Sequence, residues 1–226
     1  MCWLDFRAAW CSQDGAGVRI LGVAFEVVTA TVVNVKVPEL DIDSYHRWAA
    51  GNLVDNRNRG IFAEWLVGQA LGAIEDGKHR VEWDAWDLDY CDIGIEVKAS
   101  GLSQSWNRHE ASKRSSFNIA PPKSVWHAST DMWATNHDGT RPAHVYVFCL
   151  HEPVPANNEN VAEPNEWKFW VISGHTLDKQ LGRQQTVGIE RLNRLANPIR
   201  WTDIKPSVDA IIFAVSNAGN VANRGQ

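Results

Sequence analysis

A strict alternation of side chains in residues 93–99, which read IGIEVKA, limits this segment to one kind of structure. Side chains of a β-strand point in turn to opposite faces of a sheet. Ile95 and Val97 therefore share one face, which is expected to pack on a core. Glu96 and Lys98 share the other face, so the strand presents a carboxylate and an ammonium group side by side.

The preceding run, residues 81–88, is expected to form the partner strand of a hairpin whose turn lies at residues 91–92. Within this run, Trp86 is predicted to face the core and Asp87 the polar side. This register places Asp87 opposite Glu96. Directly opposed residues of an antiparallel pair have Cβ atoms about 5 Å apart, which is close enough for both carboxylates to share a divalent cation.

Two carboxylates with a lysine beside them are suited to phosphodiester hydrolysis. A bound Mg²⁺ lowers the pKa of a coordinated water and acts as a Lewis acid toward the phosphate. A lysine next to it can orient the attacking water or stabilise the charge that develops on the phosphate. The alternative is a surface hairpin with an ordinary Glu/Lys pair, because the spacing Glu-x-Lys arises often by chance.

The longer stretch WDAWDLDYCDIGIEVKASGLSQSW resembles the core of the PD-(D/E)XK nuclease superfamily. It is most similar to a bacterial branch in which an aspartate precedes a short hairpin, Glu-Val-Lys and then Gln-Ser-Trp. The resemblance extends over residues 56–201. It implies an α/β fold with a restriction-endonuclease-like core, in which helices flank a mixed central sheet.

In that superfamily the aspartate and the glutamate bind Mg²⁺, which Mn²⁺ can replace, and the lysine assists the water. The resemblance therefore implies metal binding by Asp87 and Glu96, and catalysis by these two residues with Lys98. It also implies a catalytic role for Gln104 and a third metal ligand at Glu64. The chain departs from the pattern by lacking the proline that names the superfamily.

Other acids compete with Asp87 for the metal. Asp84 has the opposite parity and would point toward the core side or an exposed edge. Asp89 has the right parity but falls near the turn. Asp92, next to Gly94, is typical of a turn residue. Asp87 is therefore preferred, with Asp89 as the second choice.

The role of Glu64 depends on its helix. Residues 61–71 are apolar nearly all round, which indicates a buried helix. A carboxylate in such a helix is costly unless it is paired or bound to a metal. A metal ligand and a salt bridge to Arg57 or Lys98 are equally compatible with the sequence, and both place Glu64 near the site.

A polar segment with local positive charge follows the hairpin, although the whole chain of 226 residues has a formal charge of -5. Long basic side chains beside an acidic site favour contact with a phosphate backbone. The residues expected to contact nucleic acid are Trp106, Arg108, Lys113 and Arg114. A solvated loop remains the alternative for this segment.

The rest of the chain divides into three parts. Residues 1–45 form an extension of uncertain structure, residues 46–216 the nuclease-like domain, and residues 217–226 a flexible tail. Within the domain, three further elements are predicted: strands at residues 144–150 and 167–173, and a short helix at residues 189–195.

The cysteines and the apolar segment at residues 20–35 bear on the cellular compartment of the protein. Cys2, Cys11, Cys91 and Cys149 show neither CxxC spacing nor a histidine partner, so no zinc site or disulfide framework is expected and a reducing cytoplasm is favoured. Residues 20–35 are apolar, but no basic segment or cleavage site precedes them, which argues against a signal peptide and a membrane span.

These observations predict a Mg²⁺-dependent nuclease, an endonuclease acting on DNA, with restriction or genome defence as its expected role. Cutting both strands of a duplex often requires two active sites, which favours a homodimer. The alternative is a nucleic-acid-binding module of the same fold that does not cleave.

Overall fold

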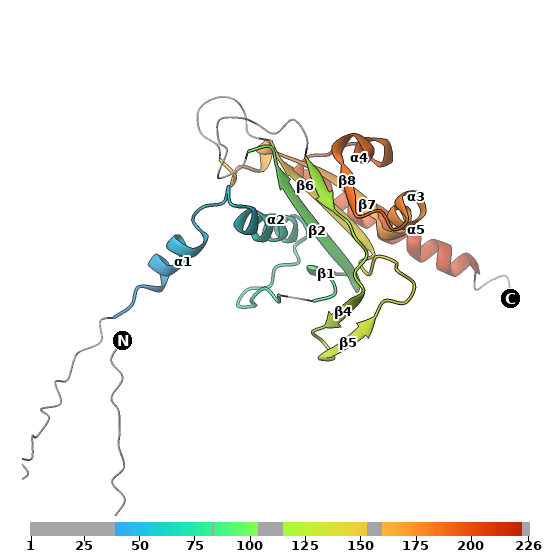
Figure 1. Cartoon of the computed structure of the whole chain (residues 1–226), viewed down its shortest axis with the longest axis horizontal. Helices are drawn as coiled ribbons and strands as arrows, with labels where there is room; N and C mark the ends of the chain where they lie inside the picture. Colours follow the sequence, from blue (N-terminus) through green and yellow to red (C-terminus); the bar gives the residue numbers. More distant parts are fainter. Residues whose placement is uncertain (1–38, 83, 104–114, 153–159, 223–226) are drawn as a thin grey trace, which may run out of the picture. The chain divides into compact units, whose positions relative to one another are not determined.

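The computed structural model describes residues 39–82, 84–103, 115–152 and 160–222. The chain separates into two units, residues 1–40 and 41–226. Everything described below belongs to the second unit (Figure 1). Its first helix, α1 (Ile42–Ala50), begins after Asp41, whose side chain accepts a hydrogen bond from the Asp43 backbone N–H, and it buries none of its residues.

A four-stranded mixed sheet forms the centre of the domain, in the order β1 (Leu88–Tyr90), β2 (Ile93–Gly101), β6 (Val145–His151) and β7 (Trp167–Ser173). β2 runs antiparallel to β1 and parallel to β6, and β7 returns antiparallel to β6. All seven residues of β6 are buried, because both faces of the sheet are covered. The predicted α/β class with a mixed sheet is therefore confirmed.

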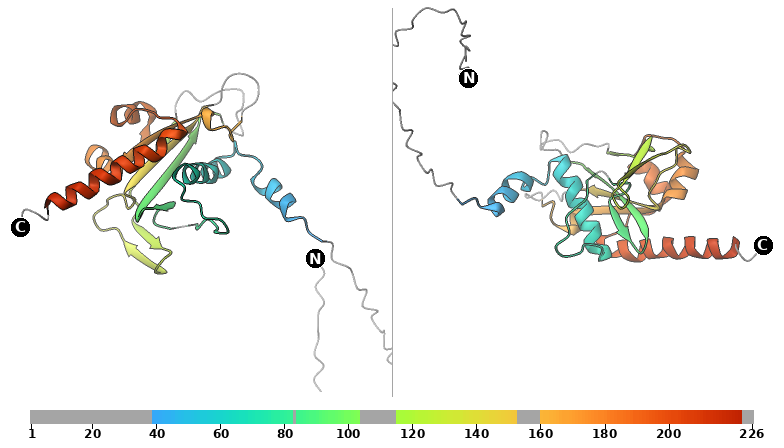
Figure 2. Two further views of the ribbon diagram at one scale, coloured as in Figure 1. Left: turned by 180° about the vertical axis from the view of Figure 1, so that it is seen from behind. Right: turned by 90° about the horizontal axis from the view of Figure 1, so that it is seen from below.

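The first face of the sheet packs on α2 (Asn56–Leu71) and α5 (Ile204–Ala222). Figure 2 shows α5 running across this face. Ile95 and Val97 of β2 are buried in the core between them, as the alternation predicts. Since the apolar side chains of β2 face this core, Glu96 and Lys98 are left on the opposite face of the strand.

A second core covers the opposite face of β6 and β7. It is built from α3 (Gly174–Leu181), α4 (Ile189–Leu195) and a two-stranded sheet of β3 (Ser116–Asn118) and β8 (Thr186–Gly188). Phe148 and Trp170 are among its fully buried side chains. The remaining elements are the hairpin β4 (Ser124–His127) and β5 (Met132–Thr135), and the short helices η1 (Pro164–Glu166) and η2 (Trp201–Asp203).

The predicted hairpin turn is confirmed at Cys91 and Asp92. Both residues have positive φ, 51° and 61°, which is the backbone of a two-residue hairpin turn of type I′. Pairing of Leu88 with Ile95 and of Tyr90 with Ile93 fixes the register. The residues next outward from the Leu88 pair are Asp87 and Glu96, so the expected juxtaposition of the two acids is present.

The strand expected over residues 81–88 begins only at Leu88, and the predicted direction of Trp86 is wrong. Trp86 packs with the second core, and its ring lies so close to Gly94 that a Cβ there would come within 2.3 Å of it. Gly94 shares its face of β2 with Glu96. Trp86 therefore lies on the polar face of the hairpin, because the chain before Leu88 does not keep the alternation of a strand.

Several other predictions agree closely with the structure. The strand at residues 167–173 and the helix at residues 189–195 have the expected bounds. The helix expected at residues 61–71 begins earlier, at Asn56, because the Asp55 side chain accepts a hydrogen bond from the Arg57 backbone N–H. α5 continues to Ala222, which lies within the segment expected to be a tail.

Of the helices that the structure describes, none is long and apolar enough to cross a membrane. Cys91 is exposed and Cys149 is buried, and both are free thiols. The expectations for Cys2, Cys11 and residues 20–35 lie outside the described part of the chain.

Candidate functional site

Asp87 lies at the point where regular pairing of the hairpin stops. Its backbone N–H donates to the carbonyl of Ile95 at 3.0 Å. Its carboxylate oxygen Oδ2 accepts from the backbone N–H of Val97 at 2.7 Å. The side chain thus takes the place of a backbone acceptor on the adjacent strand, which fixes the carboxylate beside Glu96.

Glu96 and Lys98 point from the same face of β2 and form an ion pair with each other. Their side chains are mostly covered, with 17% and 31% of their surface exposed. Both line a cavity of about 410 Å³ together with Asp87 and, on the neighbouring strand, Tyr146. The structure therefore brings together the three residues that the sequence singles out.

Burial dominates the electrostatics of this cavity. Burial, the largest cause, and the negative charge of Asp87 together raise the pKa of Glu96 to about 7, against the opposing effect of Lys98. Burial also raises the pKa of Asp87, against the opposing effects of the Val97 N–H, Lys98 and Arg80. Two carboxylates that face each other away from water are costly when both are ionised, and a cation between them offsets that cost.

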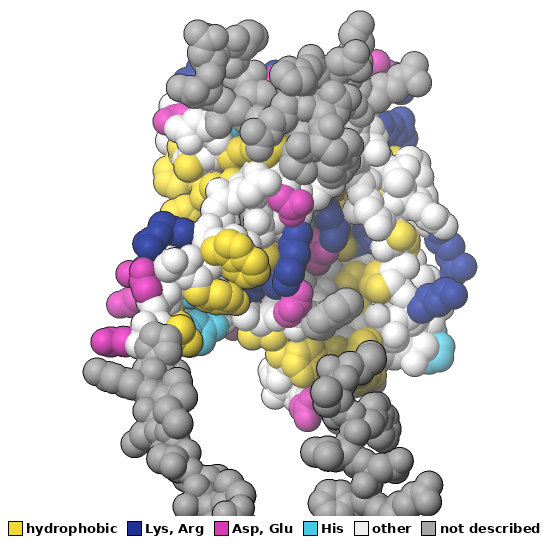
Figure 3. All heavy atoms as spheres, turned by 60° about the vertical axis from the view of Figure 1, so that its left-hand side comes forward, with side chains coloured by type: hydrophobic (Ala, Val, Ile, Leu, Met, Phe, Trp, Pro, Cys, Tyr) yellow, Lys and Arg dark blue, Asp and Glu magenta, His cyan; other side chains and the backbone are white. Residues whose placement is uncertain are grey.

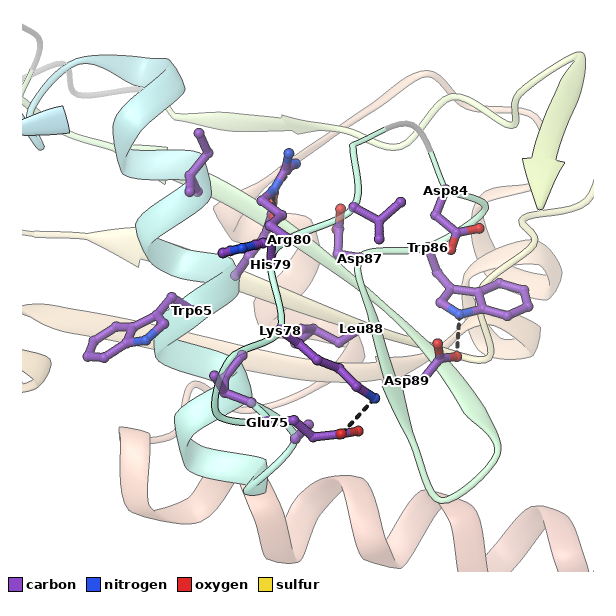
Figure 4. Close-up of a pocket in the computed structure, with 15 residues that line it drawn as sticks. Trp65, Glu75, Lys78, His79, Arg80, Asp84, Trp86, Asp87, Leu88 and Asp89 are labelled. Atoms are coloured by element: carbon purple, nitrogen blue, oxygen red, sulfur yellow. Dashed lines mark hydrogen bonds and ion pairs between the residues drawn. The ribbon is translucent and has the colours of Figure 1, made fainter. Parts of the chain in front are cut away.

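Glu64, on α2, lies next to this pair but belongs to a second cavity, of about 350 Å³, which Asp87 also lines. Its carboxylate is ion-paired with both sides of the Arg80 guanidinium, with 3.0 Å between Nη2 and Oε1. Figure 4 shows Arg80 and Asp87 at this cavity. Glu64 thus forms a salt bridge with a nearby arginine, as one alternative expects, but the partner is Arg80 and not Arg57 or Lys98.

Arg80 is the site residue that sequence reasoning missed. It comes from the irregular segment between α2 and β1, where no periodic pattern indicates a direction for its side chain. Its charge lowers the pKa of Glu64, although burial outweighs it and leaves that pKa raised. The same guanidinium interacts with Asp87. Arg80 therefore connects the helix acid with the hairpin acid.

The competing acids have other partners. Asp84 accepts hydrogen bonds from the backbone N–H groups of Ala85 at 2.7 Å and Ala128 at 3.2 Å. Asp89 accepts from Trp86 Nε1 at 2.7 Å (Figure 4). Asp92 is a turn residue, as predicted. Asp84 lines the cavity of Glu96 and Lys98 as Asp87 does, but its carboxylate is held by backbone N–H groups outside β2. The Asp87 carboxylate instead accepts from the strand that bears Glu96.

Two carboxylates, those of Asp87 and Glu96, could hold a metal, and a third, that of Glu64, is paired with Arg80. Among the residues that the structure describes, no group of three or more His, Cys, Asp or Glu side chains is placed to hold a metal ion. Mg²⁺ is usually bound through one or two carboxylates, with waters and substrate phosphates completing its shell. The oxygen ligands of Asp87 and Glu96 fit that requirement.

Positive charge near the site is matched by negative charge. On the face shown in Figure 3, basic and acidic side chains lie side by side near the middle. Three ion pairs involve residues that line the two cavities: Lys98 with Glu96, Arg80 with Glu64, and Lys78 with Glu75. The other residues expected in catalysis or nucleic-acid binding, Gln104, Trp106, Arg108, Lys113 and Arg114, lie outside the described residues.

Comparison with known proteins adds no relative: no family model matches the chain, and no curated protein matches it. The function is therefore inferred from the geometry of the site.

The raised pKa of Glu96 predicts how the metal-free protein responds to pH. Between about 4.5 and about 7 the unfolded chain loses the Glu96 proton while the folded chain keeps it. The contribution of Glu96 to stability is therefore present below this window and is lost as pH rises through it. We expect urea unfolding in EDTA to show a loss of about 1–3 kcal/mol between pH 4.5 and pH 7.5 from this group.

Glu96→Gln is the matched control, because it cannot titrate and leaves the other groups in place. Subtracting its pH dependence from that of the wild type gives the contribution of Glu96 together with its interaction with Asp87. Equal slopes for the two proteins would contradict the raised pKa.

Arg80→Met tests whether Arg80 neutralises Glu64. The change leaves a carboxylate whose side chain is only 14% exposed without its partner. We expect the metal-free variant to lose about 1–3 kcal/mol of unfolding free energy. The double variant Arg80→Met with Glu64→Gln should recover most of this loss, and urea unfolding at pH 7.5 measures all three proteins. A double variant no more stable than Arg80→Met would show that the arginine acts through packing instead.

Proposed function

We propose that this protein is a metal-dependent nuclease with a restriction-endonuclease-like core, which hydrolyses phosphodiester bonds of DNA with Mg²⁺. The observation that supports it best is the convergence of three residues in one cavity: Glu96 and Lys98 on β2, and Asp87 immediately before β1 of the same hairpin. Each residue type has a defined part in this chemistry, and the hairpin spacing alone brings them together.

The topology supports the same proposal. The strand that bears Glu96 and Lys98 lies inside a mixed sheet, between the antiparallel β1 and the parallel β6. α2 packs against the apolar face of this strand and places Glu64 beside the hairpin. A mixed sheet flanked by helices, with a helix glutamate beside the acidic hairpin, supports the proposed core, because the sequence resemblance implies these features.

In the proposed mechanism, Asp87 and Glu96 would hold Mg²⁺ through their carboxylate oxygens. Bound Mg²⁺ supplies Lewis-acid stabilisation of the phosphate and lowers the pKa of a coordinated water. Lys98, beside Glu96, orients the attacking water and stabilises negative charge on the phosphate. Water is added across one P–O bond, which yields a terminal phosphate on one product and a hydroxyl group on the other.

A second candidate is a nucleic-acid-binding module that does not cleave. The ion pairs Glu96–Lys98 and Glu64–Arg80 favour it, because they neutralise groups that catalysis would need to be free. Binding of a divalent cation in place of these ion pairs would favour the nuclease, since a pure binding module has no need of a divalent ion.

The deciding experiment incubates the purified protein with circular and end-labelled DNA in Mg²⁺ or Mn²⁺. The controls are EDTA and Asp87→Ala. Cleavage that disappears in both controls supports the nuclease, and nicked or linear circles indicate endonucleolytic action. If the protein binds DNA or RNA but cleaves neither in Mg²⁺ or Mn²⁺, the second candidate is supported. Light scattering on the same samples tests the homodimer that cleavage of both strands would favour.

A further inference from the structure

The hairpin of β4 and β5 carries two tryptophans into the candidate site. Trp126 and Trp133 are paired directly across its two strands, so they belong to one face of this ribbon. Both line the cavity that contains Asp87, Glu96 and Lys98. Two tryptophans therefore line the same cavity as the carboxylates proposed to hold the metal.

The hairpin is held at the site by contacts near its turn, which lies between His127 and Met132. The His127 ring packs on Trp86 at 5.8 Å between centroids, on the opposite face of the ribbon from Trp126. Asp84, three residues before Asp87, forms a bridge with Trp126 and accepts the backbone N–H of Ala128 at 3.2 Å. These contacts hold the hairpin beside the acidic residues.

The two tryptophan rings differ in how firmly the protein holds them. Trp126 is partly buried, and its Nε1 donates to Asp131 at 3.2 Å, which fixes the orientation of its ring. Trp133 is 69% exposed. A single exposed tryptophan is unremarkable by itself. This one lies at the edge of a cavity of about 410 Å³, within the range of about 300–1,000 Å³ typical of ligand pockets.

We propose that Trp126 and Trp133 stack on unpaired bases next to the scissile phosphate, so that the substrate is a single-stranded or locally unpaired nucleic acid. This inference rests on the proposed nuclease function and narrows its substrate class. The faces of paired bases are covered within a duplex, and only an unpaired base can stack on an indole ring. Stacking also gives affinity where acidic residues make charge attraction weak.

The test measures binding by fluorescence anisotropy in Mg²⁺, using the full chain with Asp87→Asn to prevent cleavage. The probes are labelled oligothymidylate, oligouridylate and a DNA duplex of equal length. Trp133→Ala should weaken single-strand binding about tenfold or more and change duplex binding less than about twofold. Trp133→Phe keeps a stacking ring and should stay within about threefold of the parent.

Trp48→Ala is the matched control, because Trp48 is 82% exposed on α1 and lines neither cavity. It should bind all three probes as the parent does. The proposal is overturned if Trp133→Ala binds single strands like the parent, if it loses duplex binding equally, or if the parent binds no single strand. The two single-stranded probes show whether DNA or RNA is preferred. Absence of cleavage by the wild type would refute the nuclease separately, since this assay measures binding alone.

Discussion

Asp87→Asn is expected to lower metal-dependent cleavage by about 10³-fold while the protein stays folded. The asparagine oxygen can still accept the Val97 N–H, which the Asp87 carboxylate accepts at 2.7 Å, so the hairpin is retained. The negative charge that would hold the cation is lost. A bound metal contributes several kcal/mol to catalysis, and each ~1.4 kcal/mol is a factor of ten in rate. Initial rates at saturating Mg²⁺ and circular dichroism measure the two effects.

Asp89→Asn is the control for Asp87→Asn. Asp89 lies two residues away, is exposed, and bonds to Trp86 Nε1 instead of facing Glu96. Its substitution should change the cleavage rate by less than about twofold. The assignment would be reversed if Asp89→Asn lost cleavage and Asp87→Asn kept it. It would be wrong altogether if neither substitution changed the rate.

The alternation of residues 93–99 is what made the core of the site predictable. Strand parity alone places Glu96 and Lys98 on one face, and a two-residue turn then brings Asp87 level with Glu96. Both inferences use local geometry, in which each residue fixes the direction of the next. The strand β7 and the helix α4 were predictable in the same way, because their sequence patterns have clear ends.

The remainder of the site depends on contacts that no local pattern encodes. Trp86 lies on the opposite face from the one predicted, because the chain leaves strand geometry before Leu88 and the ring packs on Gly94. Arg80 reaches Glu64 across 16 positions of sequence. The pairing of Trp126 with Trp133 likewise becomes visible only when the hairpin register is known.

Lys98→Met is expected to lower the cleavage rate by about 10²–10³-fold, through two separable effects. The first is loss of the cation that orients the water and stabilises charge on the phosphate. The second acts through Glu96, whose pKa of about 7 is held down by Lys98. Without Lys98 that pKa rises further, so less of Glu96 is ionised near pH 7 and metal affinity falls.

Lys98→Arg separates the two effects, because it keeps the positive charge but not the compact ammonium group. Metal affinity, measured by titration of Mg²⁺, should return toward the wild-type value, while the rate at saturating Mg²⁺ stays low. Lys168→Met is the matched control. Lys168, on β7, forms an ion pair with Glu152 that is more exposed than the Lys98–Glu96 pair, and it lines neither cavity. If Lys98→Arg restored both metal affinity and rate, Lys98 would serve only as a charge beside Glu96, and the orientation of the attacking water would have to come from another group.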